Sequence, residues 1–276
     1  MIFVYKKWEE FCKKLHNNNM HSIPACDVTS NLKDYLVLKH DVETDVFRAY
    51  KIAEIEHRFG HRGSYYIQAY LLDDTRNVEM LSKMLEMGHE ISYHYDVLDS
   101  SKGDLDKAII EFENNLKLFE SKGFNFCTVC QHGNPIIERN GYNSNRDFFR
   151  SQKVQELYPD VSDIMVNFKE KVPTDYLYFS DAGRVFKLIF DPINNDIINS
   201  DDENISYKDL DALFEDIDEE KGNIISIHPH RWTQSAMVYF AKTFIFRILR
   251  FVSKFLVKIP MFNKLMSKYY YLAKKA

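Results

Sequence analysis

Short apolar runs alternate with stretches of helical periodicity along the first 232 residues of the chain. Runs of four or five residues that are rich in β-branched and aromatic side chains predict strands at 35–39, 64–68, 90–93, 126–129, 176–179 and 223–227. Apolar positions three and four residues apart predict helices at 45–58, 78–87 and 105–121. Segment 135–175 is irregular, and 190–206 has the composition of a loop. Strands and helices in alternation predict an α/β fold with a parallel sheet covered by helices.

Polar clusters that are unusually rich in His and acidic residues follow five of the predicted strands. They are His40-Asp41-Val42-Glu43, His94-Tyr95-Asp96, Gln131-His132-Gly133, Ser180-Asp181 and His228-Pro229-His230. In parallel β/α architectures, active sites lie at the carboxyl ends of the strands. We therefore expect these clusters to converge on one site.

The residue types in these clusters indicate metal-dependent hydrolysis. Asp41 and Glu43 are two residues apart, so on an extended segment both carboxylates point to the same side. One carboxylate can hold an ion with nearby imidazoles, while the other takes a proton from water. The alternative is a helix-capping Asp beside a solvated Glu. Among the histidines, His94 has Asp96 nearby to orient it, whereas we expect His89, at the start of its strand, to be structural.

The last cluster continues into the densest string of candidate site residues, His228-Pro229-His230-Arg231-Trp232. Pro229 stiffens the segment, and an indole such as that of Trp232 can stack on a sugar ring. The aromatic content of 14% suits a sugar-binding surface or an aromatic core equally well.

Cysteine usage and the apolar runs bear on the compartment. Cys12, Cys26, Cys127 and Cys130 follow no disulfide framework, and Cys127 and Cys130 face opposite sides of a strand, which argues against joint metal ligation. We expect both to be core thiols. With no apolar run long enough to span a membrane and no recognisable signal peptide, these features predict a cytoplasmic protein.

The charge is distributed unevenly along the chain. The net charge is −5, yet residues 233–276 contain nine Lys or Arg and no Asp or Glu. An acidic body argues against nucleic-acid binding, and we treat 1–232 as a domain and 233–276 as a basic amphipathic helical tail. In residues 241–275, basic positions three or four apart lie beside a broad apolar face. Such a segment either docks on the body or lies on an anionic membrane surface, and the absence of acidic residues favours the membrane.

Four segments, in order between residues 35 and 232, resemble motifs of the polysaccharide deacetylase superfamily: LKHDVET, GSYYIQ, GHEISYH and IISIHPHRW. The third, similar to Gly-His-Glu-Ile-Gly-Asn-His, is the most specific. The resemblance implies a distorted (β/α)7 barrel that hydrolyses N-acetyl groups with zinc or a similar divalent ion.

The resemblance also implies roles for individual residues. Asp41 would be the base that activates water, Glu43 a metal ligand and His94 the first histidine ligand. His228 would be the general acid and Asp181 the acidic residue that tunes it.

This sequence departs from the family pattern at two motifs. The family's second ligand histidine falls on Leu98, and CQHGNP stands where the family has Arg-x-Pro. His132 is our candidate for the missing ligand.

The function implied is removal of N-acetyl groups from a carbohydrate in surface-polysaccharide biosynthesis, with Trp232, His230 and Arg184 as expected substrate contacts. Two alternatives stay open. One is a hydrolase of another small amide or a nucleotide-linked amino sugar on the same scaffold. The other is a catalytically inactive carbohydrate-binding barrel, which the loss of a ligand at Leu98 supports.

Overall fold

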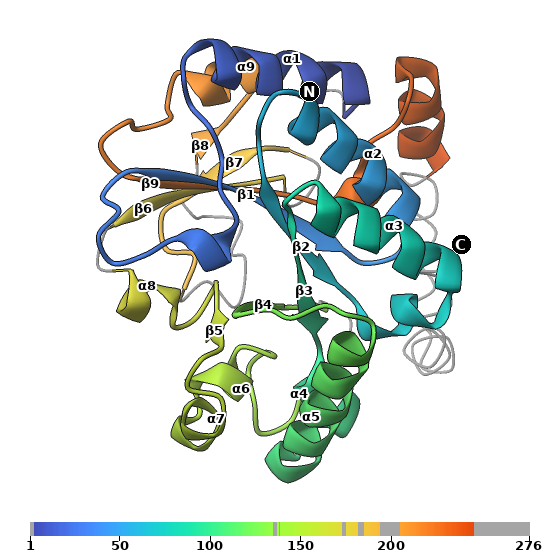
Figure 1. Cartoon of the computed structure of the whole chain (residues 1–276), viewed down its shortest axis with the longest axis vertical. Coiled ribbons are helices and arrows are strands. Elements are labelled where there is room, and N and C mark those ends of the chain that lie inside the picture. Colours follow the sequence, from blue (N-terminus) through green and yellow to red (C-terminus); the bar gives the residue numbers. More distant parts are fainter. Residues whose placement is uncertain are drawn as a thin grey trace.

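A single nine-stranded sheet forms the centre of the chain, as seen in a computed structural model (Figure 1). The structure describes residues 3–134, 137, 139–172, 175–181, 185–193 and 205–245. The strands are β1 (Tyr35–Val42), β2 (Gly63–Ile67), β3 (Glu90–Tyr95), β4 (Thr128–Gln131), β5 (Ser162–Asp163), β6 (Tyr176–Ser180), β7 (Lys187–Ile189), β8 (Ile205–Ser206) and β9 (Gly222–Ile227). Their order is β5-β4-β3-β2-β1-β9-β6-β7-β8. Neighbours from β5 to β6 are parallel, whereas β7 and β8 are antiparallel additions.

Each of the six strands and three long helices predicted from the sequence overlaps an observed element. The helices are α2 (Val46–Arg58), α3 (Thr75–Glu86) and α5 (Leu105–Ser121). The Asp45 side chain caps α2 by accepting a hydrogen bond from the Arg48 amide. The mostly parallel α/β sheet with covering helices is therefore confirmed.

The sequence analysis missed the helix α1, which is as long as α2, and several shorter elements. They are α1 (Tyr5–Asn17), η1 (Ala25–Asp27), η2 (Ala69–Asp73), α4 (Val97–Ser101), α6 (Asp147–Arg150), α7 (Gln152–Leu157), α8 (Phe168–Lys171), α9 (Leu210–Phe214) and η4 (Pro229–Arg231). Segment 135–175, which lacks sequence periodicity, thus contains three short helices and β5. The end of the predicted loop 190–206 forms β8, and 194–204 lie outside the described residues.

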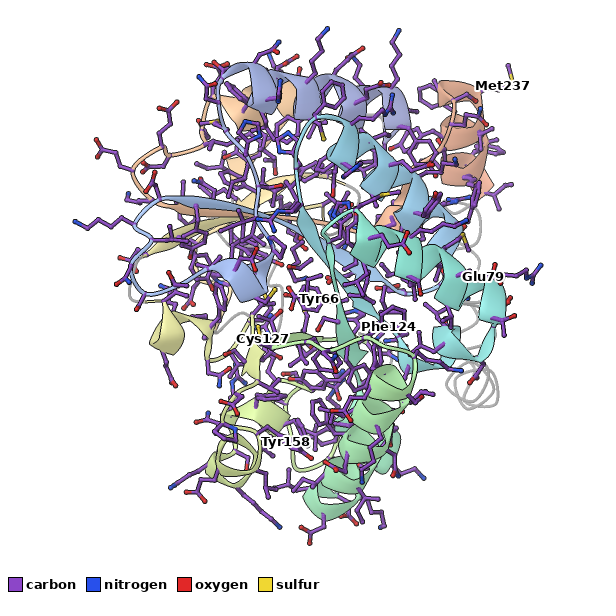
Figure 2. The ribbon with its side chains drawn as sticks, in the orientation of Figure 1. Tyr66, Glu79, Phe124, Cys127, Tyr158 and Met237 are labelled. Carbon is purple, nitrogen blue, oxygen red and sulfur yellow. The ribbon has the colours of Figure 1, made fainter. Side chains whose placement is uncertain are left out.

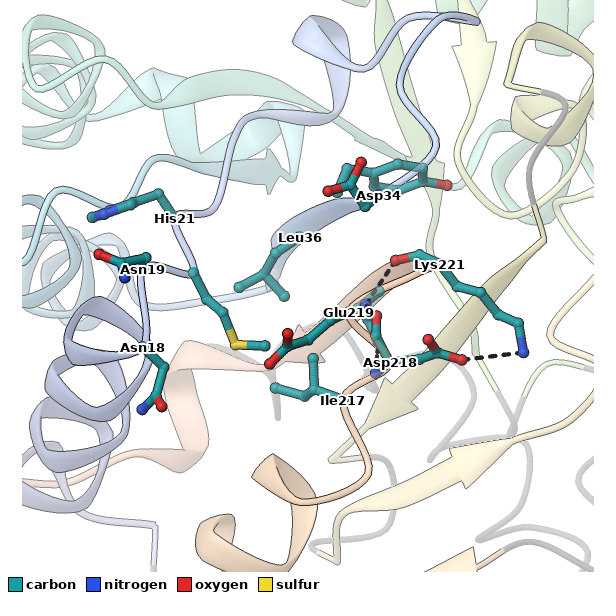
Figure 3. Close-up of a pocket in the computed structure, with 12 residues that line it drawn as sticks. Asn18, Asn19, His21, Asp34, Leu36, Ile217, Asp218, Glu219 and Lys221 are labelled. Carbon is teal, nitrogen blue, oxygen red and sulfur yellow. Dashed lines mark hydrogen bonds and ion pairs between the residues drawn. The ribbon is translucent and has the colours of Figure 1, made fainter.

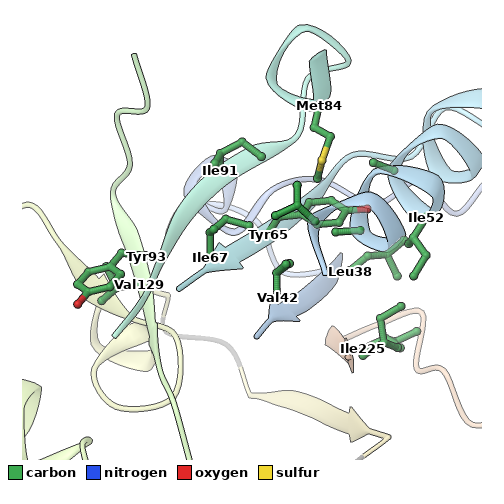
Figure 4. Close-up of a cluster of buried hydrophobic side chains, with 14 of the residues drawn as sticks. Leu38, Val42, Ile52, Tyr65, Ile67, Met84, Ile91, Tyr93, Val129 and Ile225 are labelled. Carbon is green, nitrogen blue, oxygen red and sulfur yellow. The ribbon is translucent and has the colours of Figure 1, made fainter. Parts of the chain in front are cut away.

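Both faces of β1 are buried, which is usual for a central parallel strand. Leu36, Leu38 and Val42 belong to the larger hydrophobic cluster, which lies between the sheet and α2 and α3 (Figure 4). Val37, Lys39 and Asp41 alternate with them and point to the opposite face. One strand therefore contributes apolar side chains to the helix layer and places polar side chains on the other face.

That other face carries a second buried cluster with members from strands far apart in the sheet. It includes Val37 of β1, Tyr66 of β2, Cys130 of β4, Tyr178 of β6 and Ile224 of β9. Figure 1 shows the sheet bending, with α1, α2, α3 and α5 on its outer side. The sheet thus curves around an inner core that is distinct from the helix-covered one.

The beginning of the predicted tail packs on the body of the protein. The Thr233 amide donates to the Phe3 carbonyl at 3.0 Å, and the Tyr239 ring lies 6.0 Å from that of Phe3. A helix covers residues 236–245, on which Met237 is 81% exposed (Figure 2). Contacts with the body therefore continue past residue 232, and residues 246–276 lie outside the described part of the chain. Within the described part, none of the helices combines the length and apolar character needed to cross a membrane.

Candidate active site

Three side chains predicted to hold a metal ion converge beyond the carboxyl ends of β1, β3 and β4. Each residue contributes one donor atom, and the three atoms, from Glu43, His94 and His132, lie within 4.8 Å of one another. Nε2 of His132 is 3.6 Å from Oε1 of Glu43, and the rings of His94 and His132 meet edge to face at 5.1 Å. One carboxylate and two imidazoles form a donor set that suits zinc, which binds three protein ligands in catalytic sites.

The orientation of His94 fits a metal ligand, although its partner differs from the one expected. Its Nδ1 donates to the carbonyl of Cys130 at 3.0 Å, which leaves Nε2 for an ion. The expected orienting residue, Asp96, does not make this contact. Leu98, at the position of the family's second histidine, lies in α4 and is buried in the hydrophobic core. His132, which follows β4, lies beside Glu43 and His94 instead.

Asp41 lies beside this cluster and is held by a buried lysine that the sequence analysis did not identify. Nζ of Lys39 donates to Oδ1 of Asp41 at 2.5 Å and to Oγ of Ser226 at 3.3 Å. Oδ2 of Asp41 is 3.8 Å from Nε2 of His228. The available signal was a lysine within the apolar run YLVLK, two residues before Asp41 and therefore on the same face.

His228 is held in one orientation by Asp181. Its Nδ1 lies 2.6 Å from Oδ1 of Asp181, while Nε2 faces Oε1 of Glu43 at 3.9 Å. Arg231, which belongs to the same string of candidate residues but had no role assigned to it, donates to the same Asp181 oxygen at 2.9 Å. A carboxylate behind one nitrogen fixes the tautomer and presents the other nitrogen to the site, as the assigned pair of roles requires.

Electrostatics favour the ionised carboxylates of Asp41 and Asp181 and the neutral imidazoles of His94 and His230. Burial favours a high pKa for Asp41, but the charge of Lys39 outweighs it and the pKa falls below its ordinary value. Burial likewise opposes ionisation of Asp181, yet Arg231 keeps its pKa low. Burial lowers the pKa of His94 and of His230 to about 3.

Of the three residues predicted to contact substrate, the structure places one at the site and one in the core. His230 lies at the site, with Nδ1 4.0 Å from Oε2 of Glu43. Trp232 does not: it is 0% exposed and packs against Trp8 and Phe3, each at 5.2 Å between ring centroids. The prediction of sugar stacking by Trp232 is therefore wrong, because η4 turns the chain back into the core after His230. Arg184 lies outside the described residues.

Two further histidines are structural. His40, which the sequence analysis grouped with the site, points to the helix layer, where Nε2 lies 3.0 Å from Oε1 of Glu56. The same buried carboxylate accepts hydrogen bonds from Trp8 and Tyr65. His89 accepts from the amide of Gly63, as expected of a structural residue.

The two neighbouring cysteines differ in their surroundings. Cys130 is buried in the inner core, as predicted, and its Sγ also lies within 4.8 Å of donor atoms of Asp41 and His94. Cys127 is only partly exposed to solvent but belongs to neither hydrophobic cluster. The prediction of a core thiol therefore fails for Cys127.

A pocket of about 250 Å³ lies elsewhere, between the amino ends of β1 and β9 (Figure 3). Its lining includes Asp34, Leu36 and Asn223. Asp41 and Glu43 lie at the other end of β1, so this pocket is separate from the convergent site.

A scan against models of protein families and a search of curated proteins both find no match to this chain. The interpretation of the site therefore rests on its geometry and on the motif resemblance. The arrangement brings together three side chains that could hold an ion, a carboxylate beside them and a histidine backed by a second carboxylate, all at the carboxyl edge of one sheet.

Proposed function

We propose that the chain is a metal-dependent amide hydrolase that removes N-acetyl groups from a carbohydrate. The observation that carries this proposal is the convergence of Glu43, His94 and His132 beside Asp41 and the Asp181-backed His228. Hydrolysis of an amide needs an activated water, a stabilised oxyanion and an acid for the leaving nitrogen. This site contains a candidate for each of these needs.

Glu43, His94 and His132 would hold the ion, and one carboxylate with two imidazoles favours zinc. When bound, a zinc ion supplies Lewis acidity that polarises a carbonyl and lowers the pKa of water. Asp41 accepts the proton of the attacking water. Lys39 donates a hydrogen bond to Asp41 and another to Ser226, which fixes the position of the ammonium. His228 delivers a proton from Nε2 to the departing nitrogen, while Asp181 and Arg231 fix its ring.

The architecture we propose is the distorted (β/α)7 barrel of the polysaccharide deacetylase type. The inner cluster supports it, because side chains of β4 and of β6 meet in one core although the strands lie far apart in the sheet order. Five strands then direct their carboxyl ends toward the same mouth. The carbohydrate nature of the substrate rests on the motif resemblance, since the buried Trp232 removes one sugar-stacking candidate.

The test is release of acetate by the zinc-loaded full chain from a panel of N-acetylated mono- and oligosaccharides, nucleotide-linked amino sugars and simple amides. We expect turnover of an N-acetylated sugar and none by Asp41→Asn. Turnover confined to simple amides or to nucleotide-linked sugars would support the alternative hydrolase. Sugar binding without acetate release, in protein shown to contain the ion, would support an inactive carbohydrate-binding barrel.

A further inference from the structure

A second group of potential metal ligands lies at the opposite end of the sheet from the candidate active site. Cys26 is in η1, Glu90 is the first residue of β3, and Cys127 immediately precedes β4 (Figure 2). One donor atom from each of these residues lies within 4.8 Å of the others. His94, by contrast, is near the carboxyl end of β3, so the two groups are separated along the strand.

Glu90 is a buried carboxylate, 5% exposed, surrounded by neutral donors. Its Oε2 accepts a hydrogen bond from Ser64 at 2.6 Å and a longer one, 3.4 Å, from the Cys26 amide. Its Oε1 accepts one from Thr128 at 2.6 Å. Within the described part of the chain, Glu90 forms no ion pair with a Lys, Arg or His. A carboxylate taken out of water without a cation is costly, and a bound cation would supply the missing charge.

The two thiols provide the chemistry that selects such a cation. Both cysteines are partly exposed, their sulfur atoms lie within 4.8 Å of each other, and the Cys26 thiol donates to Oδ1 of Asp27 at 3.8 Å. Zinc binds thiolates at about 2.3 Å and carboxylate oxygens at about 2.0–2.2 Å, so tetrahedral ligand atoms stand roughly 3.5 Å apart. Three donor atoms within 4.8 Å of one another can reach that spacing by small side-chain rotations.

We propose that Cys26, Cys127 and Glu90 form a second metal site, for a thiophilic divalent cation such as Zn²⁺. Solvent fills the fourth position, because Cys26 is partly exposed. Binding converts the two thiols to thiolates and releases their protons to solvent, with no change in oxidation state. The ion ties η1 to the starts of β3 and β4, which gives it a structural role. The inference is independent of the proposed hydrolase function.

The experiment uses the full chain, reduced and freed of metal with a chelator, and titrates it with Co²⁺. Cobalt bound by thiolates shows a sulfur-to-metal charge-transfer band in the near ultraviolet. We expect this band in the wild-type protein and in His94→Ala, and its loss in Cys26→Ser and in Cys127→Ser. Cys12→Ser is the control that should keep the band, since Cys12 is a buried thiol of α1 in the larger hydrophobic cluster.

Glu90→Gln provides the graded test. It keeps the shape of the side chain but removes the charge, so cobalt affinity at this band should fall at least about tenfold. Circular dichroism of each variant checks that the fold is kept. If Glu90→Gln does not fold, Cys26→Ser still tests the site, because it changes only a partly exposed side chain.

Absence of the band in the wild-type protein, or its survival in both Cys26→Ser and Cys127→Ser, would overturn the proposal. The proposal would also be overturned if the intact mass of the protein were lower by two hydrogens, returned to the full value with reductant, and the reduced protein gave no cobalt band. That result would show that Cys26 and Cys127 form a disulfide instead. None of these outcomes changes the expectation for Glu43, His94 and His132.

Discussion

Nζ of Lys39 lies 2.5 Å from Oδ1 of Asp41, two residues further along the same face of β1. The Lys39 ammonium is buried, with the Tyr66 ring 5.5 Å away and the Ser226 hydroxyl as its other polar partner. The Lys39 ammonium stabilises the Asp41 carboxylate through Oδ1, while Oδ2 faces His228. One strand therefore carries both Asp41 and the ammonium that balances its charge.

Replacing Lys39 by Met tests this pairing. The variant leaves Asp41 without its cation, and breaking one side of a buried ion pair costs about 3–5 kcal/mol of unfolding free energy. The double variant Lys39→Met/Asp41→Asn should recover part of that loss, because no uncompensated charge remains. Urea unfolding of the wild-type protein, Lys39→Met, Asp41→Asn and the double variant measures the coupling free energy between the two side chains. Equal stability of Lys39→Met and the wild type would contradict the proposed pairing.

Replacing His228 by Ala should lower kcat for amide hydrolysis about 10²–10⁴-fold, because the acid for the leaving nitrogen is lost. Asp181→Asn should lower kcat as well, since it removes the acceptor for Nδ1 of His228. Metal content should stay unchanged in both variants. His57→Ala, which changes an exposed histidine on α2, is the control. Undiminished turnover by His228→Ala would show that another group supplies the proton.

Removing either histidine of the ion site should weaken metal binding. We expect His94→Ala and His132→Ala each to lose at least about tenfold in zinc affinity, measured by competition with a chromogenic chelator. A chelator should lower the melting temperature of the wild-type protein, because an ion that binds only the folded state stabilises it. Unchanged affinity in His132→Ala would remove this residue from the ligand set and point to Cys130 or Asp41 instead.

His61 should make stability depend on pH. Its Nε2 donates to the Cys12 carbonyl at 2.9 Å and its Nδ1 accepts from the Ser22 amide. Because an imidazole has an acceptor nitrogen only when it is neutral, the folded state favours the neutral ring. Burial lowers the pKa of His61 below the ordinary 6.5. The unfolded chain thus binds the proton more readily, and stability is present above about pH 6.5 and declines as pH falls below it.

The measurement is the unfolding free energy between about pH 7.5 and about pH 5.5. His61→Gln should show a smaller decline over this range than the wild type, although it is less stable at neutral pH. His57→Gln, which alters an exposed ring, should keep the wild-type pH dependence. A decline of the same size in His61→Gln would mean that His61 has the same pKa in the folded and unfolded states and does not contribute to the pH dependence.

The basic tail carries a prediction that rests on the sequence alone. The full chain should float with anionic vesicles in a density gradient, less so at raised salt, because basic residues and Phe side chains suit an anionic interface. Replacing Arg247, Arg250, Lys254 and Lys258 together by Gln should abolish flotation. A wild-type chain that remains at the bottom of the gradient would identify the tail as a packing element.

Strand ends were the most informative part of the sequence. Short apolar runs rich in β-branched and aromatic residues located the strands, and parallel pairing then required that the residues at the carboxyl ends of β1, β3, β4 and β9 share one edge. Glu43, His94, His132 and His228 were brought together for this reason. The backbone pattern thus predicts which residues meet, even where their partners are set by tertiary structure.

Other features depend on packing that no local pattern encodes. Trp232 is as compatible with a sugar-binding surface as with the core, and only the turn of η4 decides. The proximity of Cys26 and Cys127 arises because η1 lies against the starts of β3 and β4, although about a hundred residues separate the two in sequence. Short helices such as α6 and α7 lack enough turns to show a periodicity.

The pairing of β1 with β9 has a consequence for how this protein is made. Tyr35 to His40 find their β9 partners only after residues 222–227 have left the ribosome. Until then the nascent chain holds an apolar strand with one open edge, and such edges recruit other strands. Synthesis interrupted before residue 222 should therefore yield aggregation-prone fragments, and chaperones that shield unpaired strands should associate with this chain throughout most of its translation.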